Sequence, residues 1–599
     1  MAWYDEAVFY HIYPLGLAGA PKQNDYGEPV HRLNTLLPWV DHIKEIGGSA
    51  LYIGPLFESV GHGYETTDYK KLDSRLGTNE DLTAFVAYCH EQGIKVIFDG
   101  VFNHTGRDFF AFKDIQANRE NSQYKDWYCN VNFWGNNEYN DGFSYDNWGG
   151  YNILVKLNQK NPAVVDYICD VIRFWVSEFD VDGIRLDAAD VLDFDFMKAL
   201  RRTANEVKPD FWLMGEVIHG DYSRWVNGET LHSVTNYTLH KALYSGHNDH
   251  NYFEIAHTVR RLQNMGTLKL YNFVDNHDVE RIYTKLTNKA HFAPVHVLLY
   301  TLPGVPSIYY GSEFGIEGRK EYGSDDSLRP ALNIEDYKDS VKTNPCTALI
   351  AALGKVRQAV PALSYGSYDE LMLTNRQFAY ARDLDGTRVI VSVNNDDAPA
   401  GMHLAAGNCT AYIGALSGEK VSVQDGHINI TQPANSGEIW VPEGTDLDVK
   451  PVKVVTKTES EAKANTEDKA ASETATDAKG NQESEPKIES KESKDIVTAT
   501  ESADAKKNTT NTEKNISAAN EVKDSAKDAS AQAAADTPVD PETITVDWSK
   551  SPESMTVPEL QAAILAKLAR NGPVDAQMKK TVTDNIWHDS LVNWLKSFR

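Results

Sequence analysis

The sequence predicts an α/β fold built on a (β/α)8 TIM barrel, with a small antiparallel β-sandwich after it. Three observations lead to this prediction. The chain has 599 residues, which is too many for one hydrophobic core. Short apolar runs alternate with segments of helical periodicity up to about residue 360. Beyond that point, short alternating strands are separated by Gly, Asn and Asp.

Eight segments of the first region have the composition of buried strands. They span residues 7–14, 49–57, 95–102, 183–188, 211–217, 233–239, 270–276 and 307–313. Helical periodicity lies between several of them, at 80–92, 162–179 and 194–207. Strands that alternate with helices are usually parallel, and eight such units favour a closed barrel over an open sheet. We therefore predict a barrel over residues 1–361.

The remaining segments predict four further parts of the chain. An insertion of about 55 residues after the third strand is too long for a plain loop, so we predict an inserted domain at 103–160. The antiparallel sandwich is predicted at 362–444. Residues 445–547 contain no Phe, Tyr or Trp and predict a disordered linker. A short helical module is predicted at 548–599.

The helical module contains two apolar stripes. The first follows a capping pattern from Thr556 to Glu559, and the second is formed by Trp587, Leu591, Leu595 and Phe598. Two short helices rarely make a stable core alone. We expect them to dock on the barrel, to self-associate with a second copy, or to bind a protein partner.

The bulk composition excludes some classes of function. The formal net charge of −27 argues against nucleic acid and anionic membranes as main partners. The 5 cysteines are scattered and form no CxxC pair, so neither a disulfide framework nor a zinc site is indicated. No basic segment followed by an apolar run opens the chain, and we expect a cytoplasmic location.

Three acidic residues stand where predicted strands end: Asp187 in "GIRLD", Glu216 in "WLMGE" and Asp278 in "FVDNHD". Charged side chains at the rim of an apolar core are unfavourable unless they form ion pairs or have a role in binding or catalysis. Active sites of such barrels lie at the carboxyl ends of the strands, so parallel neighbours would bring the three acids into one pocket. Cleavage of a glycosidic bond requires carboxyl groups arranged in this way.

The neighbouring residues suggest separate roles for the acids. Arg185 points to the same face of its strand as Asp187 and would keep that carboxylate ionised for nucleophilic attack. Glu216 ends an apolar run, which favours a protonated carboxyl and a general acid. His277 could bind sugar hydroxyls beside Asp278. Taken singly, each of these groups is equally explained as a structural ion pair, a helix-start residue or a turn former.

Further polar and aromatic residues surround this pattern. Asp99, Asn103 and His104 form a fourth polar cluster after the third strand, in "DGVFNHTG". The insertion is rich in aromatic side chains that could stack on sugar rings or form its own small core, including Trp127, Trp134, Tyr145 and Trp148.

The ordered motifs DxxxNH, GIRLD, GE and NHD resemble the signature of the α-amylase family of glycoside hydrolases over residues 1–444. The resemblance implies that Asp187 is the nucleophile, Glu216 the acid/base and Asp278 the transition-state stabiliser. It also implies a set of substrate-binding residues: Tyr64, Asp99, His104, Arg185, His219 and His277.

The segment "VKLN" at 155–158 resembles the element that marks the neopullulanase and cyclomaltodextrinase branch, which usually has Pro where Val155 stands. This chain begins directly at the first predicted strand, without the N-terminal domain common in that branch. The implied chemistry requires no cofactor. A bound Ca2+ is an open alternative, for which Asn103 matches one ligand position.

The leading hypothesis is a retaining hydrolase that cleaves α-glucosidic linkages, mainly α-1,4, of maltodextrin or starch-derived oligosaccharides by double displacement. An α-glucanotransferase would use the same covalent intermediate and pass it to a sugar acceptor. A third alternative is a barrel without catalytic activity that serves as a scaffold, with the helical module as its working part.

Overall fold

The computed structural model describes residues 2–266, 268–321, 324–449, 451–452, 546, 548, 550–552, 555–568, 579, 582 and 595. The chain divides into two compact units, Met1–Thr500 and Glu501–Arg599. Most of the predicted linker at 445–547 lies outside the described residues. The boundaries assigned to the domains from sequence stay predictions.

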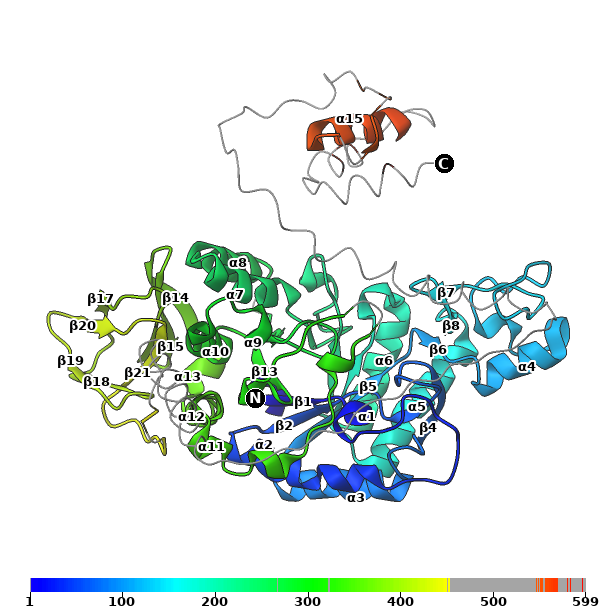
Figure 1. Cartoon of the computed structure of the whole chain (residues 1–599), viewed down its shortest axis with the longest axis horizontal. Helices are drawn as coiled ribbons and strands as arrows, with labels where there is room; N and C mark the ends of the chain where they lie inside the picture. The colour runs from blue at the N-terminus through cyan, green and yellow to red at the C-terminus, as the bar shows by residue number, and fades with distance from the viewer. Residues whose placement is uncertain are drawn as a thin grey trace, which may run out of the picture. The chain divides into compact units, whose positions relative to one another are not determined.

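The first unit is built around a barrel of eight parallel strands (Figure 1). Hydrogen bonding follows the chain order from one strand to the next, and an isolated bridge between Thr235 and Tyr271 joins the sixth strand to the seventh. The strands are β1 (Phe9–Ile12), β2 (Ala50–Ile53), β5 (Lys95–Gly100), β9 (Gly183–Leu186), β10 (Trp212–Gly215), β11 (Ser233–Val234), β12 (Tyr271–Asn272) and β13 (Val305–Tyr309). The predicted α/β barrel is confirmed.

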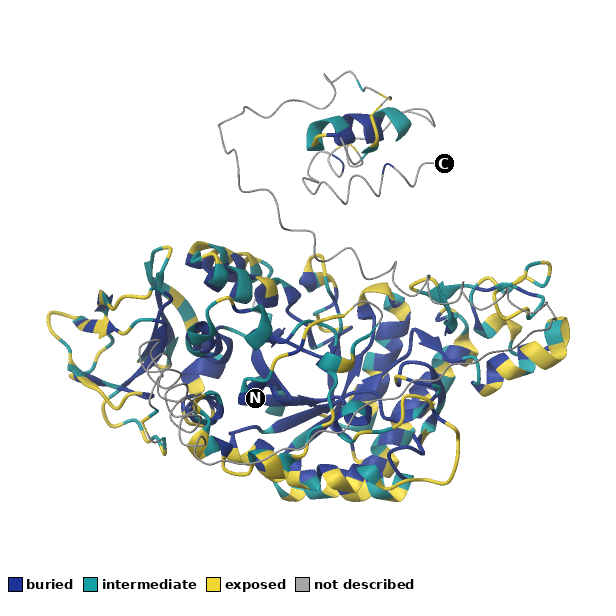
Figure 2. Ribbon diagram, viewed as in Figure 1, coloured by how far each residue is buried: buried dark blue, intermediate teal, exposed yellow. Residues whose placement is uncertain are grey.

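Helices accompany most of the connections between these strands. They are α1 (Pro14–Leu17), α2 (Leu37–Glu45), α3 (Asn79–Glu91), α5 (Pro162–Phe179), α6 (Phe194–Val207), α7 (Tyr237–Asn248), α8 (Tyr252–Asn264), α9 (Ile282–Lys285), α10 (Phe292–Thr301), α11 (Ser340–Thr343), α12 (Pro345–Ala359) and α13 (Pro361–Tyr365). Their apolar faces turn toward the strands, and Figure 2 shows the resulting buried centre. The barrel core is therefore a filled layer of side chains.

Local sequence sets the ends of these helices. Thr78 caps the start of α3 in a capping box. Its hydroxyl accepts a hydrogen bond from the backbone N–H of Asp81, and the Asp81 carboxylate accepts one from the backbone N–H of Thr78. The sixth strand is shorter than the apolar run 233–239 predicts. The side chain of Asn236 accepts a hydrogen bond from the backbone N–H of Leu239 and so caps the start of α7. The helix therefore begins at Tyr237, and the strand before it has only two residues.

A small sheet stands between the third barrel strand and α5. It contains β6 (His104–Thr105), β7 (Asn147–Trp148) and β8 (Tyr151–Lys156), and it is accompanied by α4 (Phe110–Asn118). A separate hairpin of β3 (Phe57–Ser59) and β4 (Thr66–Leu72) follows the second barrel strand. Both additions extend from the same end of the barrel as the carboxyl ends of the strands that lead into them.

An antiparallel sandwich follows the barrel. Its larger sheet has the order β14-β15-β16-β21-β18-β19, and β17 pairs with β20 in a second sheet. The strands are β14 (Ser367–Leu373), β15 (Gln377–Leu384), β16 (Thr387–Asn394), β17 (Ala400–Ala405), β18 (Ala411–Gly414), β19 (Lys420–Ser422), β20 (His427–Gln432) and β21 (Ser436–Pro442). A Cβ atom at Gly437 would lie 2.9 Å from the side chain of Val297, so glycine permits β21 to approach α10.

The second unit contains α15 (Val557–Leu568). Its predicted cap is present, since the amide and the hydroxyl of Thr556 both donate to Glu559. Leu560, Ile564 and Leu565 are buried in a cluster that also contains Val582 and Leu595. The second predicted stripe lies outside the described residues except for Leu595. No helix in the described part of the chain is long and apolar enough to span a membrane.

Candidate active site

Neighbouring barrel strands bring the predicted acids to the same level. Asp99 and Arg185 are direct partners in the pairing of β5 with β9, and Arg185 pairs in turn with Met214 on β10. The amide of Asp187 donates to Gly100 at 3.1 Å, and the amide of Glu216 donates to Leu186 at 2.9 Å. The strand register therefore places Asp187 and Glu216 side by side at the carboxyl end of the barrel.

The guanidinium of Arg185 holds three carboxylates. Its Nη1 lies 2.8 Å from Asp99 and 2.9 Å from Asp187, while its Nη2 lies 3.0 Å from Glu216. The Arg185 side chain is only 4% exposed, so these charge-assisted contacts are shielded from water. The amide of Ala188 also donates to Glu216 at 3.2 Å. One buried cation thus fixes the relative position of the predicted nucleophile and the predicted acid.

The charges around Asp187 have opposite effects on its pKa. Burial raises the pKa of the Asp187 carboxyl well above its ordinary value, and the nearby Glu216 and Asp99 carboxylates add to the rise, whereas Arg185 opposes it. The site therefore holds more negative charge than Arg185 neutralises. Arg185 was expected to keep Asp187 ionised, but burial and the neighbouring carboxylates outweigh its effect on the pKa of Asp187.

Tyr64, His277 and Asp278 form the other side of the site. The Tyr64 hydroxyl donates to Asp99 at 3.1 Å and lies 2.5 Å from His277 Nε2. The rings of Tyr64 and His277 are nearly parallel, with centroids 5.7 Å apart. His277 Nε2 also lies 3.1 Å from the Asp278 carboxylate. This chain of contacts connects Asp278 to the Arg185 group through Asp99.

Sequence reasoning missed Arg329 and Lys320, which both bind Asp278. Arg329 donates to the Asp278 carboxylate at 3.0 Å, and Lys320 donates to the backbone carbonyl of Asp278 at 3.0 Å. Burial raises the pKa of Asp278, but His277 and Arg329 outweigh it and hold that pKa well below its ordinary value. No strand-end pattern marks these two residues, because they lie in the long segment after β13.

Replacing Arg329 with Gln should raise the pKa of Asp278, because it removes the cation that favours the ionised carboxylate. Since Asp278 must be ionised to stabilise positive charge, the acid limb of the pH profile of kcat/KM should move toward neutral pH. We expect kcat/KM at pH 5 to fall about tenfold. Lys338→Met is the control, because the Lys338 side chain is 73% exposed and pairs with Glu335. Equal profiles for wild type and Arg329→Gln would contradict the assignment.

Two tyrosines also contact the acids. The Tyr237 hydroxyl donates to Glu216 at 3.3 Å, and the Tyr52 hydroxyl donates to Asp99 at 2.8 Å. Tyr52 lies on the second barrel strand, and Tyr237 begins α7. Tyr237 lies inside the strand predicted at 233–239, where a single tyrosine is a normal core residue, so the sequence did not mark it as part of the site.

His104 begins β6 of the inserted sheet, and Asn103 directly precedes it. Burial lowers the pKa of His104 to about 3, so its imidazole is neutral. Its Nε2 is buried and has no hydrogen-bond partner among the described residues. The Asn103 amide oxygen accepts the side-chain amide of Gln159 at 3.4 Å. His219 is separate from this pair, exposed on the loop after Glu216.

The surroundings of Asn103 do not fit a calcium ion. Calcium needs six to eight oxygen ligands, which are carboxylates, backbone or amide carbonyls and water. The Asn103 amide oxygen already faces an N–H donor, and within the described ranges no three His, Cys, Asp or Glu side chains converge on a metal position. We therefore derive no step of the reaction through calcium.

A closed parallel barrel with three carboxyl groups at its strand ends defines an enzyme of the glycosidase class. Comparison with known proteins agrees. The model of the α-amylase catalytic domain matches residues 32–355, and this chain belongs to that family.

Individual relatives share most of the chain. A cyclomaltodextrinase from Bacillus sp is 31% identical over 422 residues, which cover 66% of this chain and 74% of that protein. Neopullulanase 2 from Thermoactinomyces vulgaris is 29% identical over 473 residues, covering 73% and 78%. The solved structure of a cyclomaltodextrinase has a TM-score of 0.66 at 27% identity, covering 73% of this chain and 78% of that one.

Proposed function

We propose that this enzyme is a retaining glycoside hydrolase that cleaves α-glucosidic linkages, mainly α-1,4, of maltodextrin-like oligosaccharides. The observation that carries the proposal is the pair of contacts from one guanidinium to Asp187 and Glu216, at 2.9 and 3.0 Å. Retention requires the nucleophile and the acid to be close neighbours, with carboxyl groups about 5–5.5 Å apart. Two carboxylates on one guanidinium fit that requirement better than the wider spacing of inverting enzymes.

The reaction has two steps. Asp187 attacks the anomeric carbon, and the bond from that carbon to the leaving oxygen breaks while Glu216 gives that oxygen its proton. Glu216, now ionised, takes a proton from water, and the water oxygen displaces Asp187 from the same carbon. Asp187 returns as a carboxylate and Glu216 regains its proton, so the site is ready for another turnover.

The other site residues bind and stabilise the reacting sugar. The ionised Asp278 lies where it can offset positive charge on the ring, and His277 keeps it oriented. The neutral His104 imidazole donates or accepts a hydrogen bond with a sugar hydroxyl, and the Asp99 carboxylate accepts one. Tyr64 is nine-tenths buried and offers a ring face to the sugar. His219 is proposed as a substrate contact at the rim, from its exposed position near Glu216.

The relatives support the substrate class. Names such as cyclomaltodextrinase and neopullulanase refer to enzymes that act on α-glucans, and the similarity covers about two thirds of this chain or more. All 5 cysteines are free thiols, which supports the proposal of a reducing, cytoplasmic location. The proposed partners are α-glucan oligosaccharides, with self-association or a protein partner proposed for the C-terminal helices.

Product analysis tests the proposed function. Maltoheptaose, pullulan and a cyclodextrin should be cleaved to short maltooligosaccharides, and the new reducing ends should first appear as the α-anomer by NMR. An initial β-anomer would contradict retention. Oligosaccharides longer than the substrate would identify the transferase instead, and absence of all turnover would favour the scaffold alternative.

A further inference from the structure

A group of partly exposed aromatic rings lies where the inserted sheet meets α5. Phe110, Tyr124, Trp127 and Tyr167 form this group, and we call it the outer aromatic patch. The centroid of Phe110 lies 5.3 Å from Tyr124, 5.8 Å from Trp127 and 5.7 Å from Tyr167. The Phe110 side chain is 43% exposed, although it sits at the centre of these contacts.

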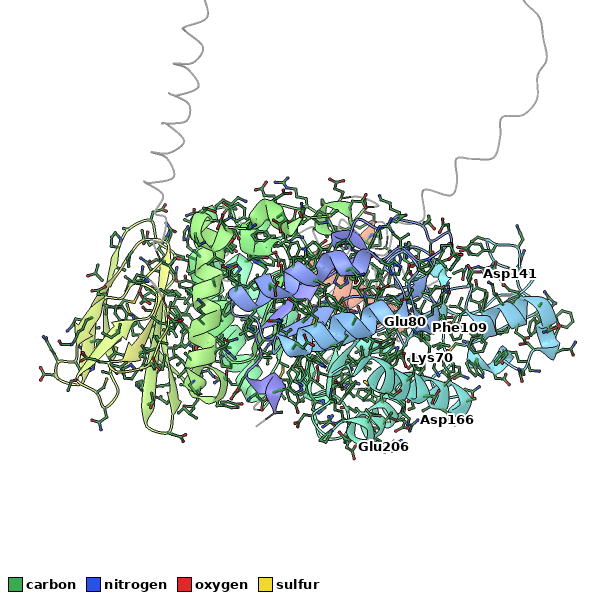
Figure 3. The ribbon with its side chains drawn as sticks, turned by 90° about the horizontal axis from the view of Figure 1, so that it is seen from below. Lys70, Glu80, Phe109, Asp141, Asp166 and Glu206 are labelled. Atoms are coloured by element: carbon green, nitrogen blue, oxygen red, sulfur yellow. The ribbon has the colours of Figure 1, made fainter. Side chains whose placement is uncertain are left out.

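Packing alone explains only part of this patch. Phe109 is the buried ring beneath it, and its contacts with Phe110 and Tyr167 join α4 to α5. Figure 3 labels Phe109 on this part of the molecule, together with Lys70, whose ammonium lies 5.9 Å from the Tyr167 ring. The buried ring makes this join, and above it Phe110 stays 43% exposed while Tyr124, Trp127 and Tyr167 are partly exposed.

A polar cavity adjoins the patch. It has a volume of about 270 Å3, and its lining includes Lys125, Asp126, Asn130, Phe133 and Asn158. Lys125 and Asp126 stand between Tyr124 and Trp127 in the chain, which places the cavity directly beside the rings. Among the described residues, none donates a hydrogen bond to the Asp126 carboxylate. Pockets for drug-sized ligands measure about 300–1,000 Å3, so this one suits a smaller unit such as one hexose ring.

The chemistry of the lining identifies the class of ligand. Lys125 and Asp126 are neighbours of opposite charge, which favours neither anions nor cations. Carboxylate, ammonium and amide groups together bind a neutral molecule with several hydroxyls. The faces of the patch rings are weakly negative and attract the C–H groups of a sugar face. A polyanion is disfavoured further by the net charge of −27.

The cavity is joined to the catalytic site by a short piece of sheet. The amide of Asn158 donates to Trp127 at 2.7 Å, and Tyr128 bridges to Leu157 just after β8. Strand β8 pairs with β6, where Lys156 is the partner of His104. A glucan held at the cavity is therefore held by the same sheet that carries a substrate-binding histidine.

We infer that the outer aromatic patch and its cavity form a second α-glucan-binding site, outside the catalytic centre. The inference rests on the proposed α-glucan substrate. The patch rings stack on glucose units, and the cavity binds the hydroxyls of a neighbouring unit. The site holds polymeric or branched glucan beside the barrel and has little influence on substrates of two or three units.

Affinity electrophoresis in gels containing amylopectin tests this site. The full chain carries Asp187→Asn so that the polymer is not degraded during the run. Trp127→Ala and Asp126→Ala should each weaken retardation about fivefold, measured as the apparent dissociation constant. Asp126→Ala leaves the ring packing intact and guards against local unfolding. Trp134→Ala is the matched control, because Trp134 is 98% exposed in the same insertion. Turnover of maltotriose by the same three variants, made without Asp187→Asn, should equal that of wild type.

The outcomes distinguish a failure of the second glucan-binding site from a failure of the proposed function. Unchanged retardation in both Trp127→Ala and Asp126→Ala overturns the second site, as does a wild-type chain that amylopectin does not retard. Equal loss in Trp134→Ala also overturns it, because the effect would then not belong to the patch. Loss of retardation in the two variants, with no turnover of any α-glucan by wild type, supports the second site and rejects the proposed function.

Discussion

Replacing Asp187 with Ala should lower kcat/KM for maltooligosaccharides by at least about 10⁴-fold, because no other group can form the covalent intermediate. The fold should remain intact. Burial and neighbouring carboxylates raise the pKa of Asp187, so its ionised form opposes folding at neutral pH. A carboxyl with a raised pKa contributes stability only at low pH and loses it as the pH rises. At neutral pH the variant should therefore unfold at the same temperature as wild type or higher.

The control for this experiment is Asp195→Ala. Asp195 is an aspartate on the next helix whose side chain is 94% exposed, so its loss should change neither activity nor thermal stability. Initial rates with maltotriose and thermal unfolding by circular dichroism are the two measurements. Activity of Asp187→Ala within about 100-fold of wild type would show that another residue is the nucleophile.

Replacing Arg185 with Met should have the largest effect on stability. The guanidinium is the shared partner of Asp99, Asp187 and Glu216, and all of these contacts are buried. Removing one member of a buried ionic group costs about 3–5 kcal/mol, because the remaining charges lose their partner. Urea unfolding at pH 7 should show this loss. Turnover should disappear as well, since the nucleophile and the acid lose their common anchor.

The pH dependence gives this prediction a second readout. Without Arg185, the buried carboxylates repel each other and their pKa values rise in the folded state. Their protonated forms then stabilise the fold, so the stability deficit should shrink as the pH falls from 7 to 5. Arg173→Met is the control, because the Arg173–Glu206 pair is exposed and such pairs contribute at most about 1 kcal/mol. A deficit of Arg185→Met no larger than that of the control would refute the anchoring role.

The order of elements could be predicted from the sequence because each is encoded locally. Alternating apolar runs and helical periodicity recur often enough to indicate a barrel, and the pattern from Thr556 to Glu559 marked the start of α15. The acids could be identified for the same reason, since each ends an apolar run. The short sixth strand was overestimated because the cap at Asn236 competes with continued extension, and composition alone does not reveal which conformation prevails.

Contacts across long sequence distances could not be predicted. Arg329 reaches Asp278 from 51 residues away, and Tyr64 reaches His277 across 213 residues. Nothing in either local sequence reports the partner, because the barrel closure brings them together. The same holds for Gln159 and Asn103, whose side chains form a hydrogen bond across 56 residues.

The sequence by itself determined the class of chemistry, since the acids at the ends of the fourth, fifth and seventh strands follow from residue identity and the strand pattern. The tertiary structure decided which cations pair with these carboxylates. One buried guanidinium between three carboxylates, and a second cation on Asp278, exist only after the strands have closed into a ring. Electrostatic interaction depends on distance and burial, and both are properties of the folded chain.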